Sequence, residues 1–330
     1  MISVGNISVG GTGKTPFVIH LLERIGKLTG GKVRTAVVSR GYRGSASGSL
    51  IVSNGRKVLA FPDTAGDEPV LIAESSSGAV VVVDKDRVRG ARLAIEGLKA
   101  KVVVLDDGFQ HRRLRRDLDI VLLDAQNPLG NRLVLPAGPL REPVKSLRRA
   151  DLILLSKVTG ELDELTTRAE KLSRVLDRPV AVSRMVPKFW RRVGKGELLT
   201  ADRIAGKKVV AFAGIAIPDS FFRTVADLQA EIQLRIPLPD HCHYSKAYMD
   251  FITRKFVQAK AEWLVTTSKD AIKLPLIFRY LPVYYLDVKM EVVVGGELLD
   301  ERIEQVLDFR HRKSKAGKID EGALKTGELL

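Results

Sequence analysis

The feature that most constrains the fold of this chain is a glycine-rich loop near its start. A short apolar stretch, residues 1–4, runs into a loop that ends in Gly-Lys-Thr. Glycine reaches positive φ without a Cβ clash, so such a loop can turn tightly and direct several backbone N–H groups at one anion. The strict G-x-x-x-x-G-K-[ST] pattern has glycine where Ser8 stands, but the other glycines supply the flexibility. We expect a nucleotide-phosphate site formed by Gly10, Gly11, Thr12, Gly13, Lys14 and Thr15.

The residues that follow the loop support this interpretation. Apolar side chains recur at helical spacing from Phe17 to Ile25, which predicts an amphipathic helix whose positive N-terminal end faces the phosphates. In such a site Lys14 reaches the β- and γ-phosphates, and Thr15 places its hydroxyl on Mg²⁺. The sequence therefore predicts a strand, a phosphate loop and a helix in direct succession.

Strand and helix patterns alternate along the rest of the chain. The strand-like segments are near-continuous apolar runs, typical of strands buried on both faces of a parallel sheet. The predicted strands are 32–39, 79–83, 101–105, 118–123, 151–155, 179–183, 208–214, 263–267 and 281–286, with a hairpin around Asn54-Gly55. One predicted helix ends at residue 75, and the others cover 86–98, 161–176, 218–230, 245–260 and 297–312. We expect an α/β fold, namely a P-loop NTPase-like, mostly parallel sheet with helices on both faces, plus a second, smaller α/β domain.

The domain organisation follows from this pattern. We expect a P-loop domain over residues 1–187 and a lid-like second domain over residues 188–312. The polar, basic stretch 188–208 would be the passage between them. The tail, 313–330, is polar and without periodicity, so we expect it to be disordered.

An acidic pair follows another predicted strand. Apolar residues 102–105 lead into Asp106 and Asp107, at the carboxyl end of the strand where an open α/β sheet binds ligands. Carboxylates there can hold Mg²⁺ against bound phosphates, directly or through water. In the alternative interpretation the two aspartates only cap the next segment.

Four further motifs have both a structural and a functional interpretation. Asp67, after Gly66, is by itself best explained as a helix N-cap. The loop Asp240-His241-Cys242-His243 suggests a metal, but its spacing is not that of a zinc site. The loop 135–143, with its Arg-Glu charge pair, and residues 266–270 at a strand end are either ordinary turns or contacts to a substrate or base.

Charge and cysteine content limit the partners. The formal net charge of +15 indicates a polyanionic partner, which nucleic acid, an anionic membrane surface or a phosphorylated substrate would each satisfy. The densest basic cluster, residues 111–116, directly follows the acidic pair. A single cysteine, Cys242, excludes an internal disulfide and fits a reducing compartment. The longest apolar runs are strand-length, too short to span a membrane.

Taken together, these motifs resemble the tetraacyldisaccharide 4′-kinases of lipid A biosynthesis, in which they occur in the same order. The resemblance covers almost the whole chain. It rests on the segments 4–16, 39–42, 66–69, 106–111, 135–143, 239–241 and 266–270. The glycine-rich loop with its Thr-Pro ending and the string Asp-Asp-Gly-Phe-Gln-His are the most specific of them.

The resemblance implies a P-loop kinase that uses ATP and Mg²⁺ to phosphorylate the 4′-hydroxyl of a tetraacylated disaccharide 1-phosphate. Its place would be the cytoplasmic face of the bacterial inner membrane, held peripherally on the anionic lipid surface. Lys14 and Thr15 would serve the phosphates and Mg²⁺, and Asp106 and Asp107 the metal and the electrostatics of the site. Asp67 would be the catalytic carboxylate, paired with His241 from the second domain.

The chain departs from the family pattern at its start. Family members usually carry a membrane-associating helix before the phosphate loop, whereas only four residues precede the turn here, so that helix is lacking. We expect either a misassigned start codon or a truncated sequence.

Two other classes of protein compete with the kinase interpretation. A P-loop GTPase or metallochaperone-type switch requires an Asn-Lys-x-Asp guanine motif, which residues 267–270 match poorly. A nucleic-acid-binding ATPase would suit the charge, but aromatic residues make up only 6% of the chain and none is interleaved with a basic stretch as a stacking platform. We expect no nucleic-acid partner.

Overall fold

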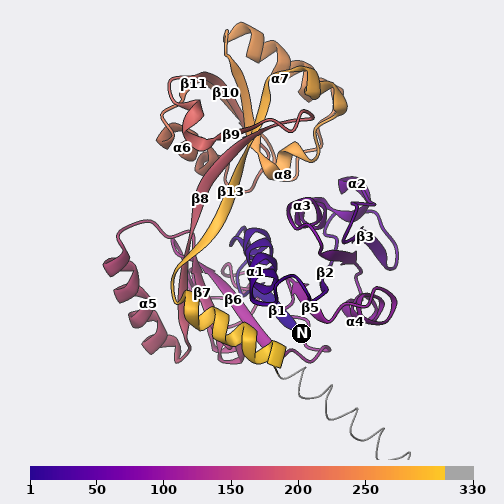
Figure 1. Ribbon diagram of the computed structural model, residues 1–330. Coiled ribbons are helices and arrows are strands. Elements are labelled where there is room, and N and C mark those ends of the chain that lie inside the picture. The colour runs from indigo at the N-terminus through magenta and orange to yellow at the C-terminus, as the bar shows by residue number, and fades with distance from the viewer. Residues whose placement is uncertain (309–330) are drawn as a thin grey trace, which may run out of the picture.

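The structure, a computed structural model, describes residues 1–308. The end of the predicted closing helix and the predicted disordered tail lie outside the described residues. Within them, the strands join in one 13-stranded sheet in the order β11-β10-β12-β13-β8-β7-β6-β1-β5-β2-β4-β3, with β9 paired to β8 (Figure 1). A mostly parallel α/β sheet is confirmed.

The strands of the first part surround β1, which carries the phosphate loop at its end. They are β1 (Ile2–Asn6), β2 (Thr35–Ser39), β3 (Leu50–Asn54), β4 (Val80–Val83), β5 (Val102–Asp106), β6 (Leu118–Asp124) and β7 (Leu152–Ser156). β1 pairs in parallel with β5 on one side and with β6 on the other. Only β3 runs antiparallel, along β4. At the predicted Asn54-Gly55 hairpin, Ser53 and Val58 form an antiparallel bridge, and the N–H of Leu59 donates to the carbonyl of Val52 at 2.7 Å.

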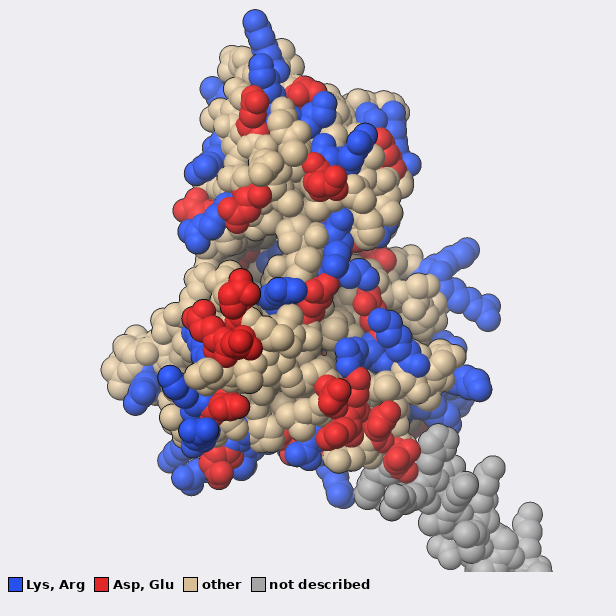
Figure 2. All heavy atoms as spheres, turned by 60° about the vertical axis from the view of Figure 1, so that its left-hand side comes forward, with Lys and Arg blue, Asp and Glu red and all other residues tan. Residues whose placement is uncertain are grey.

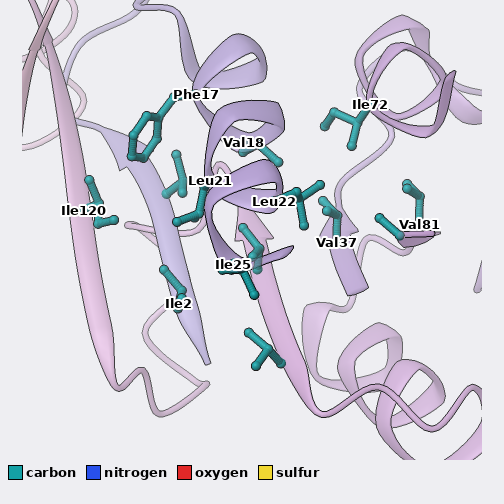
Figure 3. Close-up of a cluster of buried hydrophobic side chains, with 14 of the residues drawn as sticks. Ile2, Phe17, Val18, Leu21, Leu22, Ile25, Val37, Ile72, Val81 and Ile120 are labelled. Carbon is teal, nitrogen blue, oxygen red and sulfur yellow. The ribbon is translucent and has the colours of Figure 1, made fainter. Parts of the chain in front are cut away.

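Helices cover both faces of this part of the sheet. Alternate residues of a strand point to opposite faces, and the core clusters follow that alternation. Val37 packs with α1 (Lys14–Leu28) and α3 (Asp67–Ser75), whereas Ala36 and Val38 pack with α4 (Arg87–Arg92), which continues as a π-helical turn (Leu93–Gly97). Figure 3 shows the first cluster around α1. Helix α5 (Leu162–Leu176) covers β6 and β7 on the face opposite α1.

The second part repeats this layering on a smaller scale. Its strands are β10 (Lys208–Ala213), β11 (Glu231–Pro237) and β12 (Trp263–Thr267), and its helices are α6 (Pro218–Asp227), α7 (Lys246–Gln258) and α8 (Ser268–Ala271). Val209 and Ala211 of β10 pack towards α6, and Val210 and Phe212 towards α7. β11 was not predicted from the sequence, although its alternating Glu-Ile-Gln-Leu-Arg-Ile pattern is typical of a strand with one face exposed.

Two long strands connect the parts. β8 (Val180–Arg192) and β13 (Val283–Val294) pair antiparallel over most of their length and run from the lower part to the upper part of Figure 1. Residues 188–208, expected to be the passage between the domains, continue β8 and then form β9 (Leu198–Thr200). Its basic residues lie opposite carboxylates: Lys188 is 2.7 Å from Glu291, and Arg191 is 3.1 Å from Asp287.

The closing helix lies with the first part of the chain. It was expected in the second domain, but residues 296–308 are helical and bury Leu299, Ile303 and Val306 in the same core as α1. Arg24 of α1 donates to Asp300 with Nε at 2.7 Å. The closing helix follows β13 directly in sequence, but β13 runs back to the first part of the chain and brings the helix with it. The division at residue 187 stays a prediction.

A buried carboxylate at the end of β4 gives a stability prediction. The fully buried side chain of Asp84 accepts hydrogen bonds from Arg89 Nε (2.7 Å), the backbone N–H of Asp86 (2.8 Å) and the hydroxyl of Ser49. Burial alone would raise the pKa of Asp84, but these hydrogen bonds hold it below its ordinary value of 3.8. We expect Asp84→Asn to lower the free energy of unfolding by about 2 kcal/mol at pH 7, measured by urea denaturation.

The pH dependence of this contribution has a definite sign. Because the folded-state pKa of Asp84 is lowered, its stabilisation is complete above 3.8 and is lost as the pH falls further, through the folded pKa. The variant should therefore lose less stability than the wild type below that pH. Glu96→Gln, which breaks an exposed 3.9 Å pair with Arg92, is the control and should change stability by less than about 0.5 kcal/mol. Equal effects of the two substitutions would contradict the prediction.

Candidate active site

The glycine-rich loop lies between the end of β1 and the start of α1. Gly13 has φ of 84° at the N-cap of α1, a left-handed conformation that glycine adopts without strain. The helix buries Phe17, Val18 and Leu21 against the sheet, so its first turn is fixed at the carboxyl edge of β1. The loop residues predicted from the sequence thus form one turn at a helix N-terminus, where backbone N–H groups and the helix dipole favour an anion.

Side chains from neighbouring strands hold this loop through its oxygen atoms. Asn6 donates to the hydroxyl of Thr12 at 3.1 Å, and the Ser156 hydroxyl donates to the carbonyl of Thr12 at 2.8 Å. Lys157 donates to the carbonyl of Gly11 and lies 2.8 Å from a carboxylate oxygen of Asp124. None of these three contacts to the loop uses one of its N–H groups, although the N–H of Thr12 donates to the carbonyl of Gly10 at 3.1 Å.

Asp106 occupies the predicted place beside the loop. It ends β5 in register with Val4 of β1, and its side chain is buried. Its Oδ2 accepts a hydrogen bond of 2.8 Å from Ser39, whereas its buried Oδ1 has no hydrogen-bond partner among the described residues. Burial, followed by the nearby Glu68 carboxylate, raises the pKa of Asp106 to about 6. Glu68 is a contributor that the sequence analysis missed.

Asp107 has a different environment. Its carboxylate lies 3.4 Å from Nζ of Lys14 and accepts hydrogen bonds of 2.9 and 3.0 Å from Arg141. Burial alone would raise the pKa of Asp107, but Lys14 and Arg141 hold it below its ordinary value. Arg141 therefore pairs with Asp107 and not with the adjacent Glu142, which instead binds Arg149. The local charge pair expected in the 135–143 loop is replaced by two longer-range pairs.

The residues beside the loop fit a magnesium ion. The unpartnered Oδ1 of Asp106 is a hard, buried oxygen, and Thr15 brings a hydroxyl to the same end of the sheet. The described residues contain no group of three His, Cys, Asp or Glu side chains placed to hold a metal alone. A cation here would complete its shell with phosphate and water oxygens, as Mg²⁺ does in nucleotide sites.

Asp67 and His241 are brought together from the two parts of the chain. Asp67 is the first residue of α3, after Gly66 at φ 89°, where a Cβ would stand 2.6 Å from the carbonyl oxygen of Tyr42. His241 lies in the loop after β11, and its Nδ1 is 2.9 Å from Oδ2 of Asp67. Both side chains are mostly buried. The proximity that the resemblance implied is present, while the catalytic role of the two residues stays a prediction.

Two lysines after β12, Lys269 in α8 and Lys273 just beyond it, complete this cluster, and neither was singled out from the sequence by itself. Lys269 Nζ lies 3.3 Å from Nε2 of His241 and 3.2 Å from Asp240. Lys273 Nζ lies 3.5 Å from Oδ2 of Asp67. The 266–270 motif thus faces the dyad, and the signal for Lys273 was its position three residues after Asp270, one helical turn further on.

The remaining candidate motifs separate into other roles. Cys242 is buried, with Sγ 3.6 Å from the carbonyl of His243, and His241 turns to Asp67, so this loop does not converge on one point. In the basic cluster, Arg116 pairs with Asp119 at 3.0 Å and also donates to the carbonyl of His111 at 3.0 Å, which makes it a structural residue.

Comparison with known proteins agrees with this geometry. The family model of the tetraacyldisaccharide-1-P 4′-kinases matches residues 1–308. The chain belongs to this family. A tetraacyldisaccharide 4′-kinase of Syntrophus aciditrophicus is 43% identical over 302 residues, which cover 88% of this chain and 80% of the relative. One from Geobacter metallireducens is 40% identical over 308 residues, covering 93% and 88%.

A solved structure supports the same assignment. The crystal structure of LpxK from Aquifex aeolicus in complex with ATP is similar with a TM-score of 0.73 and 33% identity, and the match covers 92% of this chain and 87% of that one. The α/β kinase fold and the family resemblance inferred from the sequence motifs are thereby confirmed. The relatives are named as kinases, and this member of the family is accordingly an enzyme of the phosphotransferase class.

Proposed function

We propose that this chain transfers the γ-phosphoryl group of ATP to the 4′-hydroxyl of a tetraacyldisaccharide 1-phosphate. The observation that carries the proposal is the 2.9 Å contact between Asp67 and His241, at the start of a helix that packs in the same core as α1. Phosphoryl transfer needs positioning, charge neutralisation and a group that takes the proton of the attacking hydroxyl. The phosphate loop provides the first two, and the dyad the third.

The phosphate half of the site consists of Gly10 to Thr15. Loop N–H groups and Lys14 would bind the β- and γ-phosphates, and Thr15 and Asp106 would hold a magnesium ion, directly or through water. The bound ion neutralises charge on the phosphate oxygens. Asp107 and Arg141 keep Lys14 at the mouth of the loop through the contacts described above.

The acceptor half of the site consists of Asp67 and His241. The acceptor hydroxyl gives its proton to Asp67, and its oxygen forms a bond to the γ-phosphorus. The bond from phosphorus to the bridging oxygen breaks, which leaves ADP. His241 orients the carboxylate that takes the proton.

The GTPase or metallochaperone-type alternative is not favoured. Its guanine-binding aspartate would be Asp270, but that side chain is fully buried and accepts a hydrogen bond of 2.7 Å from the hydroxyl of Thr267 and one of 2.9 Å from the N–H of Gly214. Because the Asp270 carboxylate is buried and already hydrogen-bonded within the protein, it is not accessible to a guanine base.

The proposal is tested by a transfer assay. Purified protein is incubated with Mg²⁺, γ-labelled ATP or GTP, and the disaccharide 1-phosphate acceptor in detergent micelles. We expect label in the lipid with ATP and Mg²⁺ only, and little nucleotide hydrolysis when the acceptor is omitted. Acceptor-independent GTP hydrolysis without lipid labelling would contradict the proposal.

We also place the protein peripherally on the anionic cytoplasmic face of the inner membrane. Support comes from the lipid acceptor and from the net charge of +15. On the face seen in Figure 2, basic and acidic side chains are interspersed, so the excess charge is not gathered into one patch there. No helix within residues 1–308 has the length and apolar character needed to cross a bilayer.

Vesicle sedimentation tests this placement. We expect the protein to pellet with vesicles of anionic phospholipid and to be released as the salt concentration rises, because screening weakens the attraction. Neutral vesicles are the control. Equal partition to neutral and anionic vesicles would contradict an electrostatic contribution.

A further inference from the structure

An apolar loop projects from the protein after β6. Residues 131–137 are all exposed, and three large apolar side chains stand together in the middle of them. Leu133, Val134 and Leu135 are 52%, 39% and 53% exposed. Nowhere else in residues 1–308 are three consecutive large hydrophobic side chains exposed. Single exposed apolar residues are ordinary, but a contiguous group of them indicates a contact surface.

The loop is held rigidly in this exposed conformation. Nδ2 of Asn131 donates to the carbonyl of Ala137 at 3.0 Å, and Oδ1 of the same side chain accepts from the N–H of Leu133 at 3.1 Å. At Gly138 a Cβ would stand 2.1 Å from that Oδ1, so only glycine permits this closure. The N–H of Gly138 donates to the carbonyl of Val134 at 3.1 Å. The hydrogen bonds of the loop itself therefore keep its apolar tip outside the core.

The base of the loop is joined to the segment that leads into the phosphate loop. The N–H of Val9 donates to the carbonyl of Pro139 at 2.8 Å, and the N–H of Arg141 donates to the carbonyl of Ile7 at 2.6 Å. Between these two contacts, Leu140 is fully buried in the core, whereas Val9 is itself exposed. A partner that binds the apolar loop is therefore brought next to the nucleotide-phosphate site.

The charges of the loop favour an anionic partner. Residues 125–141 contain two arginines, Arg132 and Arg141, and no aspartate or glutamate. Arg141 is paired with Asp107, whereas Arg132 is exposed beside the three apolar side chains and forms no ion pair with any carboxylate of residues 1–308. An apolar tip next to an unpaired cation is typical of segments that enter the interface of an anionic bilayer.

We infer that the loop 131–137 is a membrane-contacting element: its three apolar side chains enter the headgroup region of an anionic bilayer, and Arg132 pairs with lipid phosphate. This inference rests on the proposed function, because it takes the lipid acceptor to lie in a bilayer. A stable contact with another protein needs about 20–30 residues on each side, which a tip of this size does not supply. A bilayer needs no matching surface. The contact holds the phosphate loop at the membrane, within reach of lipid headgroups.

Vesicle sedimentation without ATP or acceptor tests the loop directly. The double variant Leu133→Ser with Leu135→Ser removes two apolar side chains and none of the backbone hydrogen bonds of the loop. We expect it to bind vesicles of phosphatidylcholine and phosphatidylglycerol at least about tenfold more weakly than the wild type, because membrane binding scales with buried apolar area. The control, Val175→Ser with Val257→Ser, removes two exposed valines from α5 and α7 and should bind like the wild type. Equal binding by the two double variants would overturn the inference.

Arg132→Gln separates the electrostatic part of the binding from the apolar part. We expect this variant to bind about fivefold more weakly at low salt, the contribution of one cation near an anionic surface. The difference should shrink as the salt concentration rises, because screening weakens the attraction. The loss in the leucine variant should persist at high salt, since apolar burial is not screened. A leucine variant that regained wild-type binding at high salt would overturn the inference.

A fluorescent probe shows whether the tip enters the bilayer. Val134→Trp places an indole in the loop, while Trp190 is buried and Trp263 is stacked on Tyr284, so their emission is a constant background. We expect the emission of the variant to shift to shorter wavelength with vesicles, and to be quenched by phospholipids brominated on their acyl chains. An unchanged spectrum with bound vesicles would show that the loop stays in water, which would overturn the inference.

Two measurements separate this inference from the other possibilities. Sedimentation velocity without vesicles comes first: a wild-type dimer that the leucine variant loses would make a second copy of the chain the partner, and would overturn the membrane contact. The transfer assay then uses acceptor in the same vesicles. The leucine variant should raise the apparent KM for lipid about tenfold with kcat within about twofold, since it loses binding that is equal in the ground state and the transition state.

The outcomes of the two proposals are distinguishable. A wild type that binds vesicles through the loop but transfers no phosphate would refute the proposed function alone. An active wild type whose vesicle binding does not depend on the loop would refute the role of the loop alone.

Discussion

Replacing Lys14 with methionine is expected to lower kcat/KM for lipid phosphorylation by about 10³-fold, the upper range for removal of one preorganised charge-stabilising donor. Lys14 is the first residue of α1, and its Nζ stands 3.4 Å from Asp107 at the mouth of the phosphate loop. No other lysine or arginine begins that helix. Negative charge on the transferring phosphoryl oxygens would lose the cation at the start of that helix. Initial rates with γ-labelled ATP measure the effect.

The control for this prediction lies on the same helix. Lys27, in the last turn of α1, is exposed and far along the helix from the loop. Lys27→Met should retain wild-type rates, and both variants should unfold at wild-type denaturant concentrations. A Lys14→Met variant within tenfold of the wild-type rate would show that the loop binds phosphate without using its lysine in the transition state.

Replacing Asp67 with asparagine is expected to lower kcat by about 10²- to 10⁴-fold, the range that a general base contributes. The amide keeps the shape of the side chain but does not take the proton of the acceptor hydroxyl. Because the phosphate loop is untouched, the KM for ATP should stay within about twofold of the wild-type value. His241→Ala should have a smaller effect in the same direction, since in the proposed mechanism His241 orients the base.

Asp63→Asn is the matched control, because Asp63 is an exposed carboxylate in α2 (Pro62–Ala65), one short turn before Asp67. It should leave kcat unchanged. If Asp67→Asn kept wild-type turnover with the lipid acceptor, the assignment of the proton acceptor would be wrong. A change confined to the KM for lipid would make Asp67 a binding residue.

The sequence was sufficient for the parts of the site that depend on local chemistry. The phosphate loop needs glycines and a lysine at fixed spacing, and an acidic pair after an apolar strand belongs at the carboxyl edge of a parallel sheet. Both features were therefore placed correctly beside β1. The apolar strands also predicted the layering, because burial on both faces requires helices on both faces.

What the sequence did not reveal depends on pairing between distant segments. Arg141 binds Asp107 and not its neighbour Glu142, and Lys273 reaches Asp67 from the other part of the chain. The closing helix joins α1 because β13 carries the chain back. No local pattern encodes such contacts, since they are decided by the order of strands in the sheet.

The ribbon of β8 and β13 has a mechanical consequence. Asp67 and His241 belong to opposite ends of it, so any change in their separation must be absorbed as twist and bend of two hydrogen-bonded strands, not as free rotation about a coil. Met290 of β13 also stands against the phosphate loop, with its terminal methyl 3.2 Å from where a Cβ on Gly13 would lie. The β8–β13 ribbon therefore restricts the directions in which the two parts of the chain can move towards each other, and one of its strands contacts the phosphate loop.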